Sequence, residues 1–376
     1  MAYELQEARK LVIKAGLELL SSGLIARTWG NISARISDTQ FVITPSGLAY
    51  EDLTPEKIVI TNVSDCSYQG RLKPSSEKWI HADAYRLRPD VNFVIHTHQN
   101  YASALSILGE TISEIPMEGN LRSILGPEIP TAGYGLNGSQ ELSRNVIRAI
   151  EEHPSSAALL MSNHGAECMG TDYAGAFAIA HALEDVAKSR YRSMLQESDL
   201  LRSILPTKEE MDAVDLCSSD LSGYYRVVDP RPYSMPAAVF SSAPFTAAAS
   251  RLPISELFPY IDDQAQMIGT SLRVISQDAD DQMIQDALQG RNAVLIRGKG
   301  AICTGDSPED VDAAVMVLEK GCRAALLAMA AGDAGKIPPL HPEHAAADRS
   351  SYVNSYSKLK NAGRENGFSR SLPYER

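Results

Sequence analysis

The sequence predicts an α/β fold built from two structured regions. Short apolar runs rich in β-forming residues alternate with helical patterns from residue 1 to about 195. The chain has 376 residues, which exceeds the roughly 100–200 residues of a usual single domain. A stretch near residue 160 also recurs near residue 295, so the second region is expected to repeat part of the first.

The elements of the first region follow from residue type and periodicity. Strands are expected where β-branched and other apolar residues run together, at 41–43, 58–60, 93–95 and 159–161. Helices are expected where apolar residues recur at helical spacing, at 3–20, 77–88, 138–152 and 172–196. Asp172 supplies the start signal of the last helix. These elements make residues 1–200 the first predicted domain.

The rest of the chain divides into three predicted segments. In residues 201–252, Pro230, Pro232, Pro236 and Pro244 lie among small and polar residues, which predicts a linker or an extended crossing segment. Residues 253–336 regain the α/β pattern and form the second predicted domain. Residues 337–376 are polar and irregular, which predicts a tail that is either a packed arm or partly disordered.

The internal repeat relates Ala157–Thr171 to Asn292–Asp306. Six positions are identical without gaps: Ala158, Leu160, Gly165, Ala166, Cys168 and Gly170 recur as Ala293, Leu295, Gly300, Ala301, Cys303 and Gly305. His164 corresponds to Lys299, whose ammonium group is a poor metal ligand. We therefore read the second region as a degenerate copy that extends a subunit interface or covers the first domain's site. Arg297 and Lys299 form either an anion pocket or, as we prefer, a basic turn.

Composition excludes several classes of partner. A formal net charge of −12 repels nucleic acid and anionic membranes. No run of about 18 apolar residues occurs, so no membrane span is expected, and the N-terminus reads as an amphipathic helix rather than a signal peptide. The five cysteines are widely spaced and form no CxxC pair, which predicts reduced thiols and a cytoplasmic location.

Three histidines suggest a metal site. His96 and His98 alternate along an expected strand, so their side chains should project side by side. Alone, such a pair is equally consistent with two histidines that face solvent. His164 lies where a second strand should end, and three imidazoles at strand ends favour a zinc site. The other histidines are read as surface or helix residues: His81, His153, His181, His341 and His344.

Turn-forming segments suggest an anion pocket beside this site. Ser75 and Ser76 precede Glu77 at the start of an expected helix, where free N–H groups bind anions. The simpler reading is that Ser76 caps the helix. Two further segments offer small side chains and hydrogen-bond donors, at Gly30–Ser33 and Thr44–Gly47.

Taken in order, five motifs make the sequence resemble the class II aldolase/adducin family. They are GNIS (30–33), ITPSG (43–47), KPSSE (73–77), RPD followed by HTH (88–98) and NHG (163–165). The resemblance covers slightly more than half of the chain. It implies a three-layer α/β/α domain around a mainly antiparallel sheet, in a homo-oligomer with fourfold symmetry and sites at subunit boundaries.

The resemblance also implies roles for single residues. His96, His98 and His164 would hold Zn²⁺, or another divalent metal such as Mn²⁺, and Glu77 would be the catalytic carboxylate. The phosphate or substrate pocket would comprise Gly30, Asn31, Ser46, Gly47, Ser75 and Ser76.

The implied reaction is retro-aldol cleavage of a small phosphorylated ketose to dihydroxyacetone phosphate and an aldehyde. The family also contains decarboxylases, epimerases and dehydratases of sugar phosphates, and adducin-like modules that are not enzymes. Its aldolases use a tyrosine expected shortly after Ile115–Pro116, but residues 117–120 contain none. Tyr134, Tyr352 or Tyr356 is left as a substitute.

Overall fold

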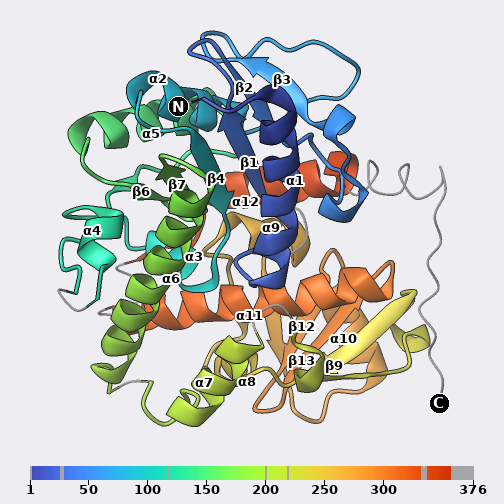
Figure 1. Ribbon diagram of the computed structural model, residues 1–376. Helices are drawn as coiled ribbons and strands as arrows, with labels where there is room; N and C mark the ends of the chain where they lie inside the picture. The colour runs from blue at the N-terminus through green and yellow to red at the C-terminus, as the bar shows by residue number, and fades with distance from the viewer. Residues whose placement is uncertain are drawn as a thin grey trace.

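The computed structural model describes residues 2–25, 29–116, 119–199, 201–217, 220–331 and 337–356, without the side chains of the last two. Two β-sheets lie on either side of a long helix, α11 (Pro308–Ala330), as Figure 1 shows. Helix α11 packs on α3 (Asn100–Ser106) of the first half and on α8 (Pro244–Ala249) and β13 (Gly300–Gly305) of the second half. The two halves therefore share a continuous core.

The first sheet has seven strands and is mainly antiparallel. Its order is β3 (Val59–Asn62), β2 (Gln40–Ile43), β1 (Gly30–Arg35), β4 (Phe93–Thr97), β7 (Gly165–Gly170), β6 (Ala158–Met161) and β5 (Thr131–Ala132). Every neighbouring pair is antiparallel except β5 and β6, which are parallel. The mainly antiparallel sheet implied by the motifs is therefore confirmed for this half.

Helices cover both faces of this sheet because its strands are apolar on both sides. On β4, Phe93 and Ile95 join one core and Val94 joins the other. The first core is closed by α1 (Leu5–Ser21), α3 (Asn100–Ser106) and α6 (Tyr173–Gln196), and the second by α2 (Lys78–Leu87) and α5 (Gln140–Glu152). The four predicted strands and four predicted helices are present, with ends shifted by a few residues.

The second sheet has six strands. Its order is β10 (Glu256–Leu257), β11 (Leu272–Ile275), β12 (Ala293–Ile296), β13 (Gly300–Gly305), β9 (Ala237–Ser241) and β8 (Tyr225–Val227). Only β11 and β12 run parallel among these neighbours. Helices α8 (Pro244–Ala249) and α11 cover one face, and α10 (Asp281–Leu288) contacts β11 and β12 on the other.

The prediction for residues 201–252 needs correction. This segment contains α7 (Lys208–Leu216), β8, β9 and α8, and β9 pairs with β13 inside the second sheet. Its prolines delimit elements: Pro236 directly precedes β9, and Pro244 is the first residue of α8. Proline is tolerated at both places because no ladder or helix hydrogen bond needs its missing N–H. The proline-rich composition therefore marks boundaries between elements rather than a linker.

The remaining elements are short. They are α4 (Leu121–Leu125), α9 (Asp262–Met267), α12 (Pro342–Ser351), the 3-10 turns η1 (Tyr50–Asp52), η2 (Pro55–Lys57), η3 (Ser222–Tyr224) and η4 (Arg231–Tyr233), and the π-turn η5 (Tyr352–Tyr356). Helix α12 packs against α9, so the tail begins as a packed arm. Residues 357–376 lie outside the described residues.

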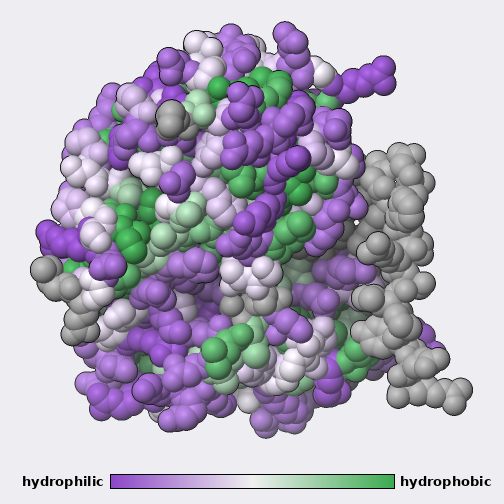
Figure 2. Space-filling model, viewed as in Figure 1, coloured by the Kyte–Doolittle hydropathy of each residue, from purple (hydrophilic) through white to green (hydrophobic). Residues whose placement is uncertain are grey.

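Several expectations from composition can be compared with the structure. All five cysteines are free thiols. Among the described helices, none is long and apolar enough to cross a membrane. Hydrophilic residues cover most of the face in Figure 2, and hydrophobic residues form patches among them. The Arg297 guanidinium donates to the carbonyls of Leu252 and Ile254, which supports the basic turn over the anion pocket.

Candidate metal centre and substrate cavity

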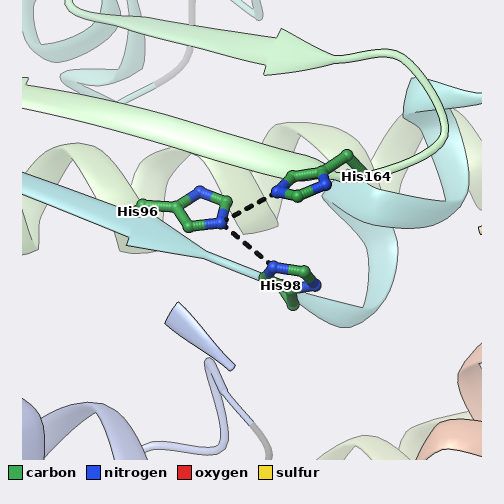
Figure 3. Close-up of side chains that lie close together, drawn as sticks. All are labelled: His96, His98 and His164. Atoms are coloured by element: carbon green, nitrogen blue, oxygen red, sulfur yellow. Dashed lines mark hydrogen bonds between the residues drawn. The ribbon is translucent and has the colours of Figure 1, made fainter. Parts of the chain in front are cut away.

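Three imidazole rings meet at the end of the first sheet (Figure 3). His96 is on β4, His98 follows its last residue, and His164 lies in the turn between β6 and β7. The Nε2 atom of His96 is 3.0 Å from Nε2 of His98 and 3.0 Å from Nε2 of His164. All three side chains are buried. The structure thus brings together the three residues that the sequence singled out.

Backbone geometry in the β6–β7 turn explains why His164 reaches the other two rings. Asn163 has a φ of 60°, a left-handed conformation that asparagine tolerates and that allows the tight turn. A Cβ at Gly165 would collide with the Thr97 carbonyl, so only glycine lets β7 approach the end of β4 this closely. The turn residues therefore place His164 beside His96.

The protonation of His96 leaves one ring nitrogen, Nε2, free to bind a metal ion. Its Nδ1 is 2.9 Å from the Ala166 carbonyl, which can only accept, so Nδ1 carries the proton. Burial lowers the pKa of His96 to about 3, so the ring is neutral at neutral pH. The lone pair of Nε2 consequently points at the other two rings.

Glu77 adds a carboxylate to this cluster. It occupies the N-cap position of α2, and its Oε1 is 3.0 Å from Nε2 of His164 while Oε2 is 3.3 Å from Nε2 of His96. Burial alone would raise the pKa of Glu77, but the neighbouring histidines outweigh it and hold the pKa well below its ordinary value. Asn31 Nδ2 donates to Oε2 over 2.8 Å and fixes the carboxylate.

This donor set fits a divalent transition metal. Three imidazole nitrogens and one carboxylate converge, and such mixed nitrogen and oxygen sets are typical of catalytic zinc sites. Lone pairs that face each other in a buried space repel unless a cation or a proton lies between them. His164 meets this need with a proton: burial opposes its charge, but Asp262 and Glu77 raise its pKa well above the ordinary value.

A buried hydrogen-bond chain behind Glu77 was missed by the sequence analysis. His81 lies on α2, as predicted, but it is fully buried rather than on the surface. Its Nε2 contacts Asn31 Oδ1, and its Nδ1 is 2.7 Å from Ser33 Oγ, which in turn is 2.7 Å from the Tyr85 hydroxyl. His81 thereby orients the Asn31 amide toward Glu77. The spacing of four residues between Glu77 and His81, one helical turn, was the available signal.

A cavity of about 310 Å³ opens beside the cluster. Glu77 and His98 line it together with all six residues predicted for the phosphate or substrate pocket: Gly30, Asn31, Ser46, Gly47, Ser75 and Ser76. Two loops form this wall because the Ser46 N–H donates to the Lys73 carbonyl and the Ser75 N–H donates to the Thr44 carbonyl. Segments far apart in sequence therefore present their small side chains to one space.

A further part of the cavity lining comes from the second half of the chain. Gln266 of α9, Asp348 of α12 and Tyr352 of η5 line it. Burial, with Asp262 nearby, raises the pKa of Asp348 to about 8. Of the candidate tyrosines, Tyr352 reaches the cavity. Tyr134 is not among its lining residues, and the side chain of Tyr356 lies outside the described residues.

Comparisons with known proteins agree on the first half of the chain. The profile of the Class II Aldolase and Adducin N-terminal domain matches residues 10–191. The 5-deoxy-D-ribulose 1-phosphate aldolase of Bacillus thuringiensis serovar kurstaki is 35% identical over 190 residues, which is 50% of this chain and 86% of that protein. The L-fuculose phosphate aldolase of Escherichia coli K12 is 35% identical over 185 residues, 49% of this chain and 83% of that protein.

A solved structure of L-fuculose 1-phosphate aldolase is also similar. It superposes with a TM-score of 0.47 at 27% identity, covering 56% of this chain and 95% of that one.

Proposed function

The chain belongs to the class II aldolase and adducin family and is a lyase of the aldolase type, and we propose that its substrate is a small phosphorylated ketose. Retro-aldol cleavage would give dihydroxyacetone phosphate and an aldehyde. The observation that carries the proposal is the convergence of three histidine Nε2 atoms and the Glu77 carboxylate beside a cavity walled by serines and glycines. The curated relatives carry the names of ketose phosphate aldolases.

In this proposal His96, His98 and His164 hold a divalent metal, Zn²⁺ or alternatively Mn²⁺. When bound, the ion supplies Lewis acidity that stabilises the negative charge developing as the C3–C4 bond breaks. The histidines contribute their orientation, which their buried strand ends fix before substrate arrives.

Glu77 moves the proton. Its carboxylate faces the cavity and stays ionised because the histidines depress its pKa. In the cleavage direction it would take up the proton that the C4 hydroxyl loses as the aldehyde C=O forms and deliver it to C3, and in the condensation direction it would remove that proton from dihydroxyacetone phosphate and return it to the new hydroxyl. Asn31 and His81 keep the carboxylate in place through the hydrogen-bond chain behind it.

The serine and glycine wall binds the phosphate group. Gly30, Asn31, Ser46, Gly47, Ser75 and Ser76 offer hydroxyl, amide and backbone N–H donors, which suit the oxygens of a phosphate. Substrate would then lie with its phosphate on this wall and its other end toward Asp348 and Tyr352.

The test is a Glu77→Gln variant of purified, zinc-loaded protein, assayed on a panel of ketose 1-phosphates that includes L-fuculose 1-phosphate and 5-deoxyribulose 1-phosphate. We expect wild-type cleavage of at least one member and a loss of roughly 10²–10⁴-fold in kcat for the variant. Glu141→Gln, at an exposed glutamate of α5, serves as the control. A variant that keeps full rate, or a wild type that acts only on oxo-acid phosphates or only as an epimerase or dehydratase, contradicts the proposal. A folded protein without metal or activity would point to an adducin-like module.

We further propose that the second half is a related, degenerate domain. Five strands of each sheet follow one order and one pattern of directions: β1-β4-β7-β6-β5 corresponds to β8-β9-β13-β12-β11. The catalytic domain would occupy residues 1–200, and the second domain would extend backward from 253–336 to include β8 and β9. A homo-oligomer and a cytoplasmic location stay predictions of the sequence.

A further inference from the structure

The second half of the chain reaches the histidine cluster directly. Asp262 is the first residue of α9, and its Oδ2 contacts Nδ1 of His164. Asp263 Oδ2 lies 3.6 Å from Nδ1 of His98. All four side chains are buried, and both aspartates are outside the segment shared with the family profile. The outward-facing nitrogen of each of these two rings therefore meets a carboxylate from the second half.

Hydrogen bonds hold Asp262 to the same turn that carries His164. The Asp262 N–H donates to the Asn163 carbonyl over 3.0 Å, and Asn163 Nδ2 donates to the Tyr260 carbonyl over 2.8 Å. The two bonds run in opposite directions between the β6–β7 turn and the residues at the start of α9, Tyr260 and Asp262. They set the position of the Asp262 carboxylate relative to the His164 imidazole, although neither bond involves one of these two side chains.

A buried lysine completes the contact. Lys320 of α11 forms an ion pair with Asp263, and its Nζ donates to the His98 carbonyl over 3.0 Å. Lys320 is 2% exposed, so its charge is compensated within the protein rather than by water. Helices α9 and α11 thus brace the two histidines from one side.

The charges of this buried group do not balance without a further cation. Glu77, Asp262 and Asp263 are carboxylates, and Lys320 is the ammonium paired with them. Two negative charges are left over when His164 is neutral, and the proton on His164 offsets only one of them in the metal-free protein, in a largely buried space. A bound dication offsets both, which links the second-half aspartates to the metal as well as to the histidines.

We propose that Asp262 is a positioning residue for the metal centre: it accepts the Nδ1 proton of His164 and so directs Nε2 toward the ion. A carboxylate behind a histidine ligand fixes the tautomer and ring orientation and makes the imidazole a stronger ligand. The metal affinity of the first half is then set partly by the second half. This inference rests on the metal site of the proposed function.

The first test measures Zn²⁺ and Co²⁺ dissociation constants by chelator competition for wild type, Asp262→Asn and Asp262→Ala. We expect about a 10–100-fold weaker affinity for Asp262→Ala. The Asn variant should lie between, because its amide oxygen still accepts the proton but carries no charge. Exposed Asp278→Ala, also in the second half, should match wild type. A folded Asp262→Ala protein with wild-type affinity would overturn the inference.

The second test needs no variant to fold. Nitrogen-15 NMR of the metal-free wild-type imidazoles should find a slowly exchanging, downfield proton on Nδ1 of His164. An Nδ1 without a proton would overturn the inference even if metal binds normally. Failure of the wild type to bind either ion would overturn the proposed metal site, whereas the tautomer measurement would still report on the contact between His164 and Asp262.

Discussion

The β6–β7 hairpin of the first sheet and the β12–β13 hairpin of the second occupy corresponding places and differ in chemistry. Each is followed by a long helix, α6 or α11. Asn163 and Gly298 both adopt a left-handed conformation in the two turns, with φ of 60° and 70°. The next residue is His164 in one turn and Lys299 in the other. The backbone path is thus common to both hairpins, while the histidine is present in one.

The packing constraint on the β6–β7 hairpin recurs in the β12–β13 hairpin, although the histidine does not. A Cβ at Gly165 would collide with the Thr97 carbonyl, and a Cβ at Gly300 would collide with the carbonyl of Ser241, its counterpart in strand register. In both hairpins the glycine permits the second strand, β7 or β13, to approach the neighbouring strand, β4 or β9. This requirement comes from the sheet and holds whether or not a metal binds.

A buried glutamate recurs for a similar reason. Glu184 accepts from the N–H groups of Tyr101 and Ala102 at the start of α3, and Glu319 accepts from those of Phe245 and Thr246 at the start of α8. Burial raises the pKa of both carboxyls, although these N–H donors act against it.

The proposed metal-binding positions show the opposite behaviour. The strand registers of the two sheets give His96 and His98 the same positions as Phe240 and Ser242 of the second half. Lys299 Nζ donates to the Gln277 carbonyl instead of facing such a site. The comparison teaches that the two hairpins meet the same packing requirements of their sheets, whereas the proposed metal chemistry depends on a few side chains that packing does not require.

The largest difference between the two halves should appear when the Zn²⁺ binding and activity of His98→Ala are compared with those of Ser242→Ala. Loss of one imidazole from the cluster should weaken Zn²⁺ binding by more than the roughly 10–100-fold typical of a residue behind a ligand, and abolish cleavage activity. The exposed Ser242 contributes no ligand, so its variant should keep metal and activity. Elemental analysis after dialysis, with chelator competition, measures both. Equal metal content in the two variants would refute the assigned asymmetry.

Gly165→Ala and Gly300→Ala test whether packing is shared. Each added methyl group would force two paired strands apart, and we expect each variant to lose about 1–3 kcal/mol in the free energy of unfolding. Urea denaturation measures this loss. Metal affinity separates the two, since only Gly165 adjoins a proposed ligand. Wild-type stability of Gly300→Ala would mean that the second hairpin is not held as the first one is.

Glu184→Ala and Glu319→Ala should each destabilise the protein by about 1–3 kcal/mol, because two buried N–H groups lose their acceptor. The loss should be greater for Glu319→Ala, since Glu319 also accepts from the Thr246 hydroxyl over 2.6 Å. Thermal unfolding at a fixed metal concentration is the measurement. A reversed order would contradict this account of the two helix starts.

Lys299→His should have the smallest effect. One imidazole in the second turn has no partners at Phe240 and Ser242, so we expect no additional equivalent of bound zinc and an unchanged free energy of unfolding within about 0.5 kcal/mol. Metal stoichiometry by elemental analysis decides it. A second bound ion would show that the second half has kept more of the site than its residues indicate.

Local sequence patterns predicted much of the candidate site. Alternation along one strand predicted that His96 and His98 would project side by side, and small residues in turns indicated the cavity wall that Ser46 and Ser75 line. These features depend on backbone geometry within a few residues, which residue type and spacing encode.

The remaining parts of the site depend on long-range packing. Asp262, Lys320 and Asp348 reach the site only because α9, α11 and α12 fold back onto the first sheet, and no local pattern distinguishes them from other charged helical residues. The prediction of a linker at residues 201–252 was wrong for a related reason. The prolines lie at element boundaries, which becomes visible only when β9 pairs with β13.

The divided cavity has a consequence for how such a protein can diversify. Proposed ligands and the phosphate wall lie before residue 165, whereas Asp348 and Tyr352 face them from the other end of the chain. In the proposed reaction, mutations in α12 can therefore reshape the space for the non-phosphorylated end of a substrate while the proposed ligands and Glu77 stay intact. Residues 342–351 form a natural library segment for directed evolution toward other substrates.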